Sequence, residues 1–288
     1  MTENPSTIGV FDSGFGGLTV LRALIPRLPR TQFAFIGDTA RLPYGSKSRR
    51  TIARYAVESA QFLVREQGAE FIVIACNTAS ALALDAIKDA VPVPVLGVIE
   101  PGAAAARTAS KTGDVLIIGT DATVHSHAYK AACATHHLRA YEKACPLLVP
   151  LVEEGWINHH VTDSVVRIYL GELTSAAAAA GMSADTLVLG CTHYPLLRPL
   201  IERAAPRGIT VIDSAESTAE AAVTLIDGRT TSPGLGNESR PGPAIDLDPA
   251  PEPLIRCFAT DSVEKFERLG SRFLGRPTGN VELVDLGG

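Results

Sequence analysis

Short apolar segments recur along the chain, and each gives way to glycine or small polar residues before a helical pattern begins. Apolar runs with few polar interruptions are typical of parallel strands that are covered on both faces. Because these runs alternate with helical segments, the pattern predicts a parallel α/β fold. The strands are expected at residues 8–11, 33–37, 71–75, 115–119, 186–190 and 209–212.

The helical period is clear between the second and third of these strands. Residues 51–68 place Ile52, Ala56 and Leu63 on one face of a helix, and the segment ends at Gly68. Glycine commonly ends helices because it adopts a left-handed conformation without strain. We therefore expect a surface helix with one apolar stripe in contact with the sheet.

A stretch without periodicity interrupts the alternation late in the chain. Residues 228–253 are rich in Gly, Pro and Ser, which predicts a flexible surface loop. After it, 256–260 is expected to form a strand, and 261–274 a helix that opens at Asp261 with Glu264 three positions later. The loop is therefore expected to be an insertion rather than a tail.

Two segments resemble each other and suggest two related halves. Residues 72–78 (IVIACNT) and 187–193 (LVLGCTH) both lead from apolar residues through Ala or Gly to a cysteine and then to polar residues. The prolines of 91–102 predict a strand entry or an edge strand near the start of the second half. The expected domains are residues 1–100 plus 208–288, with the 228–253 insertion, and residues 101–207.

A cysteine ends each of the two similar segments, Cys76 in the first half and Cys191 in the second. Ligands of parallel sheets bind beyond the carboxyl ends of the strands, where helix N-termini converge. If the halves face each other across a cleft, one thiol would stand on each side of a ligand. A thiol titrates near ~8.5, so either cysteine could transfer protons near neutral pH. Taken alone, either cysteine is more readily explained as a buried core residue.

Polar neighbours follow both cysteines. Asn77 and Thr78 follow the first, and Thr192 and His193 follow the second. His193 could exchange a proton with the Cys191 thiol, although a histidine after a strand is often an ordinary helix-start or surface residue.

Two loops could also bind a ligand. Residues 10–20 form a strand, then Asp12 and Ser13, then a glycine-rich loop that could expose N–H groups to an anion. That loop lacks the full spacing of a nucleotide-binding motif, and helix capping explains Asp12 and Ser13 equally well. The loop at 37–48 contains Pro and Gly, which turn formation alone would explain.

Charge and composition narrow the function classes. The 288 residues include 26 Lys and Arg against 31 Asp and Glu, a net charge of −5, without a basic block. Nucleic acid and membrane are therefore not expected as partners. The N-terminal residues lack the pattern of a signal peptide, and no apolar run is long enough to span a bilayer. We expect a cytoplasmic protein.

The cysteines and histidines do not form a metal-binding pattern. The five cysteines are widely spaced without a CxxC pair, which argues against a disulfide scaffold and a zinc ribbon. The histidines lack the spacing of a zinc site. The histidines considered are His125, His127, His136, His137, His159 and His160.

Five motifs together resemble the glutamate racemases. They occur in the family's order as VFDSGFGGLTV, GDTARLPYG, ACNTAS, PLVEEG and GCTHYP. The similarity covers residues 8–226 and resumes over 258–275. It implies two α/β domains related by a pseudo-twofold axis, with the active site between them. It also implies a cofactor-independent isomerase that interconverts L- and D-glutamate, supplies D-glutamate for peptidoglycan, and forms a homodimer.

The same resemblance implies roles for individual residues. Cys76 would deprotonate D-glutamate and Cys191 L-glutamate, and the opposite thiol would return a proton. Asp12 would assist the first thiol. His193 and Glu153 would assist the second, with Glu154 as an alternative to Glu153. The positions implied to hold the substrate are Asp12, Ser13, Tyr44, Gly45, Asn77, Thr78, Thr192 and His193.

Other functions stay open from the residues alone. A related racemase could act on aspartate or hydantoins, and a thiol hydrolase could use Cys191 as nucleophile with His193 as base. A two-lobed binding protein without catalysis would also fit the fold. Because no lysine adjoins either cysteine motif, pyridoxal phosphate and other cofactors are not expected.

Overall fold

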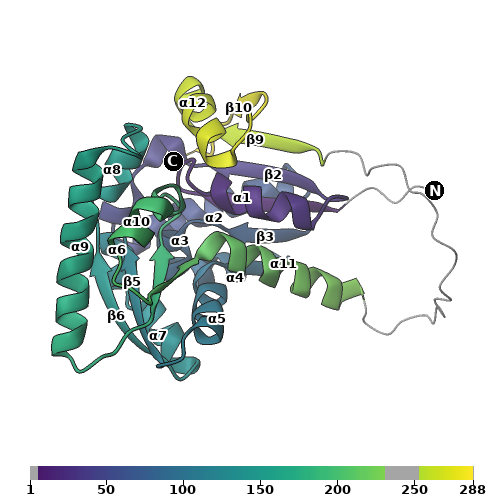
Figure 1. Cartoon of the computed structure of the whole chain (residues 1–288). Coiled ribbons are helices and arrows are strands. Elements are labelled where there is room, and N and C mark those ends of the chain that lie inside the picture. Colours follow the sequence, from purple (N-terminus) through teal and green to yellow (C-terminus); the bar gives the residue numbers. More distant parts are fainter. Residues whose placement is uncertain (1–5, 231–252, 288) are drawn as a thin grey trace, which may run out of the picture.

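The first of two parallel sheets is built from both ends of the chain. The computed structural model describes residues 6–230 and 253–287. Figure 1 shows the two sheets in neighbouring lobes. The strand order is β10-β9-β2-β1-β3-β4, with every pair parallel. These strands are β1 (Thr7–Asp12), β2 (Gln32–Gly37), β3 (Phe71–Ile74), β4 (Val95–Gly97), β9 (Ile255–Ala259) and β10 (Val281–Leu283).

The second sheet lies in the other lobe and is also parallel. Its order is β6-β5-β7-β8, which matches the order β2-β1-β3-β4 of the first sheet. The strands are β5 (Asp114–Gly119), β6 (Arg139–Ala144), β7 (Thr186–Gly190) and β8 (Thr210–Asp213). The predicted fold of two similar parallel α/β halves is confirmed.

The predicted apolar runs form the central strands. Every residue of β1, β3, β5 and β7 is buried, as expected for strands covered on both faces. The short β4, next to the prolines of 91–102, lies at an edge of the first sheet as predicted.

Strand β8 corrects the predicted domain boundary. The sequence division placed residues 208–288 with the first domain, but β8 pairs with β7 in the second sheet. The chain returns to the first half only through the next helix, α11 (Ser214–Thr230), which packs against α1 (Leu18–Leu24) and α5 (Ile99–Ala109). A strand that ends in a polar Asp-Ser pair gives no sign of which sheet it joins.

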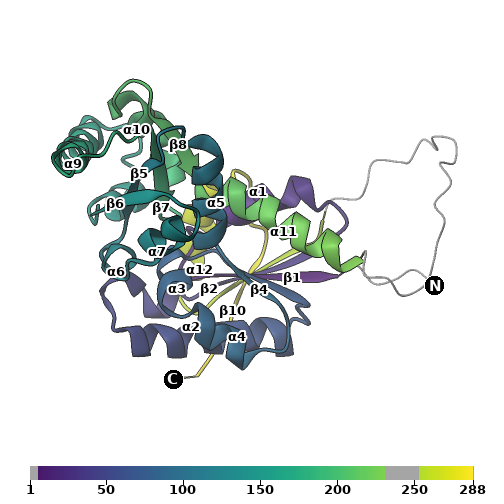
Figure 2. The ribbon, with the colours of Figure 1, turned by 90° about the horizontal axis from the view of Figure 1, so that it is seen from below.

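Helices cover both faces of the first sheet, as Figure 2 shows from below. Ser48 caps α2 by accepting a hydrogen bond from the Thr51 N–H, and the predicted stripe of Ile52, Ala56 and Leu63 is buried. Gly68, beyond the helix, has a φ of 65°. The helices of this half are α1 (Leu18–Leu24), α2 (Arg49–Arg65), α3 (Asn77–Leu82), α4 (Leu84–Ala90) and α12 (Val263–Leu274).

The predicted start of α12 is wrong in detail. The helix begins at Val263, preceded by Ser262 at a φ of 54°, and no side chain caps it. Asp261 instead accepts a hydrogen bond from the N–H of Ser262, its neighbour, so it does not reach the first turn of the helix. The predicted loop at 228–253 lies outside the described residues except for 228–230, which belong to α11, and 253.

The remaining helices connect and cover the second sheet. Figure 1 shows the long α9 on the outer side of this sheet. Among the described residues, no helix has the length and apolar character needed to cross a membrane. The helices are α5 (Ile99–Ala109), α6 (Asp121–His125), α7 (Ala128–Thr135), α8 (Leu148–Glu153), α9 (His160–Ala179) and α10 (Arg198–Ala204); short 3-10 turns occur at Ile25–Arg27, Thr39–Arg41, Tyr44–Ser46 and Tyr194–Leu197.

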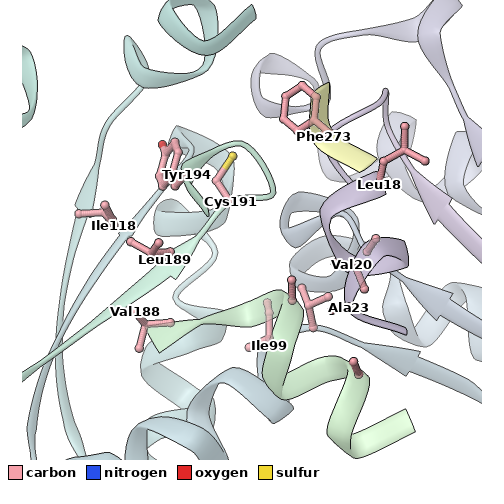
Figure 3. Close-up of a cluster of buried hydrophobic side chains, with 14 of the residues drawn as sticks. Leu18, Val20, Ala23, Ile99, Ile118, Val188, Leu189, Cys191, Tyr194 and Phe273 are labelled. Carbon is pink, nitrogen blue, oxygen red and sulfur yellow. The ribbon is translucent and has the colours of Figure 1, made fainter. Parts of the chain in front are cut away.

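One hydrophobic cluster runs through both halves. Leu18 of α1 and Val188 of β7 belong to it, and α5 and α11 contribute residues between them. Figure 3 shows these side chains and Cys191 at the end of β7. A second cluster lies only under α2, α3 and α4 of the first half. The shared cluster therefore fixes how the two halves face each other.

Candidate active site

A cavity of about 510 Å³ lies where the carboxyl ends of both sheets meet. Residues of both halves line it, which is the position expected for a ligand site between two parallel sheets. The lining residues are Ser13, Leu42, Pro43, Tyr44, Gly45, Ser46, Cys76, Asn77, Thr78, Thr120, Asp121, Pro146, Val149, Pro150, Glu153, Cys191, Thr192, His193 and Lys265.

Cys76 stands between β3 and α3 and caps the helix. Its Sγ accepts a hydrogen bond from the Ala79 N–H at 3.4 Å, and it lies 3.4 Å from the hydroxyl of Ser13. The side chain is 5% exposed, yet it lines the cavity. The thiol is therefore held by its backbone position with its sulfur next to the space where a ligand would lie.

Cys191 takes the corresponding place at the end of β7 in the second half. Its Sγ lies 4.0 Å from Nδ1 of His193. His193 Nε2 lies 3.3 Å from Oε1 of Glu153, and the other oxygen of Glu153 lies 3.4 Å from the Lys265 ammonium. A line of polar contacts thus runs from α12 of the first half to the thiol of the second.

Burial dominates the proton affinity of both thiols. It raises the pKa of Cys76 to about 11, and the nearby Asp12 carboxylate acts in the same direction. Burial also raises the pKa of Cys191, while a backbone hydrogen bond at His193 opposes the rise. At neutral pH both thiols therefore favour the protonated form.

The two carboxyl groups near the thiols differ in environment. Burial raises the pKa of Asp12, although the nearby His193 and the backbone N–H groups of Gly14 and Gly17 oppose the rise. Burial alone would also raise the pKa of Glu153, but its contacts with His193 and Lys265 hold that pKa below the ordinary value. Glu153 is therefore an anion at neutral pH, and Asp12 is the carboxyl that binds a proton more readily.

Asp12 lies behind the cavity wall rather than in it. Its Oδ2 accepts a hydrogen bond from the Gly14 N–H at 2.9 Å, while Oδ1 is buried without a hydrogen-bond partner among the described residues. A buried carboxylate oxygen without a partner is costly in free energy. Such an atom favours a bound proton, in agreement with the raised pKa of Asp12.

The glycine-rich loop brings the two halves into contact. A Cβ on Gly16 would lie 2.4 Å from Oγ1 of Thr192 and 2.6 Å from Nδ1 of His193. The Thr19 hydroxyl, after the loop, also donates to the backbone carbonyl of Thr192 at 3.3 Å. The absence of a side chain at Gly16 therefore lets the first half contact the cysteine loop of the second half directly.

The predicted substrate positions all lie at the cavity or directly behind it, but two hydroxyl groups have other partners. The Tyr44 hydroxyl donates to buried Asp38. Thr78 shares hydrogen bonds with Thr120 and Thr123 of the second half, at 3.0 and 3.3 Å between hydroxyl oxygens. The sequence did not single out Asp38, although it lies in the GDTARLPYG motif.

Other lining residues were not predicted. Thr120 and Asp121 follow β5 directly, so the rule that ligands bind beyond strand ends could have found them. Lys265 comes from a helix far along the chain, and nothing in its local pattern marks it. Pro146, Val149 and Pro150 of the second half carry no chemical signal and line the cavity by packing alone.

The remaining cysteines and histidines lie apart from the cavity. Cys133, Cys145 and Cys257 are free and buried. His127 contacts Glu142, whose side chain is nearly buried, and His136 contacts the exposed Glu100. Within residues 6–230 and 253–287, no group of three or more potential metal ligands is found.

Many known proteins are similar to this chain in sequence, and many solved structures are similar to it in fold. Residues 9–222 match the family model for Asp/Glu/Hydantoin racemase. A glutamate racemase from Koribacter versatilis is 53% identical over 295 aligned residues, which cover 100% of both chains. Family membership therefore does not depend on the motifs alone.

Solved structures agree with this assignment. A glutamate racemase isoform from Bacillus anthracis superposes with a TM-score of 0.85 at 36% identity, covering 99% of both chains. The glutamate racemase of Francisella tularensis, solved in complex with D-glutamate, superposes with a TM-score of 0.81 at 32% identity over 98% of both chains. The chain therefore belongs to the Asp/Glu/Hydantoin racemase family, as an amino-acid racemase of the glutamate racemase group.

Proposed function

We propose that this protein interconverts L- and D-glutamate without a cofactor, by proton transfer between Cys76 and Cys191. The observation that carries the proposal is the placement of these thiols, which come from different halves and line one cavity. Inversion at Cα needs a proton removed from one face and another delivered to the opposite face. Two groups on opposite walls can do this, whereas one base cannot readily reach both faces.

In the direction from D- to L-glutamate, Cys76 reacts through its minor ionised form: this thiolate takes the Cα proton, and the Cys191 thiol donates its own proton to the other face. The reverse direction exchanges these roles, and the number of protons on the protein is unchanged in each turnover. Because a Cα–H is far less acidic than a thiol, the site must stabilise the carbanion-like transition state. Hydrogen bonds in a site that excludes water can contribute about 3 kcal/mol each.

Asp12, His193 and Glu153 would assist the thiols. Asp12 lies near enough to Cys76 to affect its pKa. His193 lies 4.0 Å from Cys191, and Glu153 holds the opposite ring nitrogen of the histidine. We infer that Glu153 fixes the orientation of His193, which then passes a proton to or from Cys191.

Glutamate suits the polar groups of the cavity. Ser13, Gly45, Asn77 and Thr192 line it and would hold the amino and carboxylate groups, and Lys265 adds a positive charge. The relative from Francisella tularensis binds D-glutamate, which favours glutamate over aspartate or a hydantoin. A thiol hydrolase would use Cys191 and His193 but would leave Cys76 without a task.

The cellular role follows from the proposed reaction. D-Glutamate would be supplied for peptidoglycan synthesis. We therefore propose that the protein acts in the cytoplasm and serves formation of the cell wall. We also propose that the protein acts as a homodimer, as the resemblance to the family implies.

The reaction can be tested with the purified protein in D2O. Circular dichroism should show that either enantiomer of glutamate becomes racemic, and mass spectrometry should show one deuterium at Cα of the product. Aspartate should be turned over at least tenfold more slowly. Tight binding of glutamate without isotope exchange would instead indicate a binding protein, and faster turnover of aspartate would correct the substrate.

Replacing Glu153 with glutamine is expected to lower kcat for L-glutamate about 100-fold, at the lower end of what positioned acid–base groups contribute. The variant keeps the size of the side chain but removes the charge that faces His193 and Lys265. Because the pKa of Glu153 lies below its ordinary value, its carboxylate stays ionised throughout the neutral range and is protonated only in acid.

Glu154→Gln is the matched control, since Glu154 is exposed and does not line the cavity. It should leave kcat within about twofold of the wild-type value, as surface substitutions usually do. Equal losses in both variants would contradict the assignment of Glu153.

A further inference from the structure

Tyr129 connects the two halves behind the cavity. It lies in α7 of the second half, and its hydroxyl donates to Oδ1 of Asn77, in the first half, at 2.7 Å. Tyr129 is 0% exposed and Asn77 is 3% exposed. Water therefore does not compete for this hydrogen bond.

The hydrogen bond determines which end of the Asn77 amide is free. Because Oδ1 is taken by Tyr129, the amide can offer a ligand only its NH2 group. That nitrogen is buried and has no hydrogen-bond partner among the described residues, although Asn77 lines the cavity. A buried donor without a partner is unfavourable, so an acceptor on a ligand would complete its hydrogen bonding.

Glycines on two elements leave room for the Tyr129 ring. A Cβ on Gly102 of α5 would lie 3.2 Å from the ring, and one on Gly190 of β7 would lie 3.0 Å from it. Gly190 directly precedes Cys191, and Ser214 lies near the Tyr129 hydroxyl. Tyr129 therefore contacts both segments that carry the cavity thiols. It bonds Asn77, which follows Cys76, and packs on Gly190, which precedes Cys191.

We propose that Tyr129 is a positioning residue that orients the Asn77 amide so that its NH2 group donates to a carboxylate oxygen of the substrate. The proposal rests on the proposed function, because the carboxylate belongs to glutamate. Tyr129 does not line the cavity itself. It would affect substrate recognition through Asn77, which belongs to the other half. Asn77 would then act only as a donor and would reject ligands that present an N–H group at that point.

Tyr129→Phe tests the proposal, since it removes one oxygen atom and leaves the ring in place. KM for both enantiomers of glutamate should rise about tenfold, with kcat changed less than threefold, as expected when an interaction common to substrate and transition state is lost. The matched control is Tyr194→Phe. Tyr194 is equally buried, and its hydroxyl donates to the carbonyl oxygens of Gly119 and Cys145 at 3.0 Å each.

The control should lower thermal stability as much as Tyr129→Phe but leave KM unchanged. If both variants raise KM equally, or if Tyr129→Phe leaves KM unchanged, the positioning role is wrong. Wild-type turnover of glutamate is measured alongside, so failure of the proposed reaction is recognised separately from failure of this inference.

A double-mutant cycle separates orientation of Asn77 from general support of the fold. In an Asn77→Ala background, Tyr129→Phe should raise KM no further, because the amide through which it acts is absent. Independent additive effects in the cycle would overturn the proposal.

Asn77→Asp provides a second test that keeps the Tyr129 hydrogen bond. It replaces the amide NH2 group with an oxygen, so KM should rise by at least as much as in Tyr129→Phe. An unchanged KM in this variant would show that the Asn77 NH2 group does not contact the substrate.

Discussion

Replacing Cys76 or Cys191 with alanine is expected to lower racemisation of glutamate by about 10⁴-fold, the upper end of the contribution of a positioned acid–base group. Each thiol serves one face of Cα, so the remaining thiol cannot complete the inversion. The rate of racemisation is measured by circular dichroism from each enantiomer. Full turnover by either single variant would exclude the two-thiol mechanism.

The isotope pattern of the two variants should also differ. Cys191→Ala keeps the thiol proposed to face the proton of D-glutamate, so any residual deuterium exchange should occur with D-glutamate. Cys76→Ala should show the opposite preference. Mass spectrometry of each recovered enantiomer measures this, and exchange in the reverse pattern would require the two thiols to swap their assigned faces.

Cys133→Ala is the control for loss of a thiol as such. Cys133 is buried and free but does not line the cavity. Its removal should cost about 1 kcal/mol of stability through the small void it leaves, with the activity of the folded protein retained.

Replacing Gly16 with alanine is expected to lower kcat about 100-fold, because a displacement of about 1 Å at reacting groups can have an effect of this size. The added methyl group would overlap Thr192 and His193, so the loop that carries Cys191 must move away from the first half. Steady-state kinetics with both enantiomers measure the loss, which should fall mainly on kcat.

Gly171→Ala is the matched control for this substitution. Gly171 lies on the exposed face of α9, and its added Cβ would meet no atom within 4 Å. The change should leave kcat unaltered and stabilise the helix by about 0.5–1 kcal/mol. Wild-type activity in Gly16→Ala would show that the close approach of the two halves is not needed for catalysis.

The central strands could be predicted because burial on both faces leaves a continuous apolar run, as in β1, β3, β5 and β7. Strand β6 was missed because it lies at the edge of its sheet and includes Arg139, Glu142 and Lys143. Edge strands commonly carry charge, and such a sequence does not differ from a loop or a helix surface. The sheet that β8 joins was also beyond prediction, because pairing depends on the neighbouring strand.

The candidate site could be predicted where chemistry coincides with a strand end, as for Cys76 and Cys191. The contacts of Lys265 and Tyr129 could not, because each depends on a partner distant in the sequence. Tyr129 lies within an ordinary helix, and only the folded chain places its hydroxyl against Asn77.

The pairing of β2 with β9 has a consequence for biosynthesis. Around this pair, the Thr39 hydroxyl donates to the carbonyl of Asp261 across 222 positions of sequence. A nascent chain emerges N-terminus first, so β2 keeps an open edge until residues 255–259 have left the ribosome. An unpaired apolar strand edge attracts other chains. The synthesis of β9, a strand translated after most of the described chain, thus determines when this edge of the newborn sheet is covered.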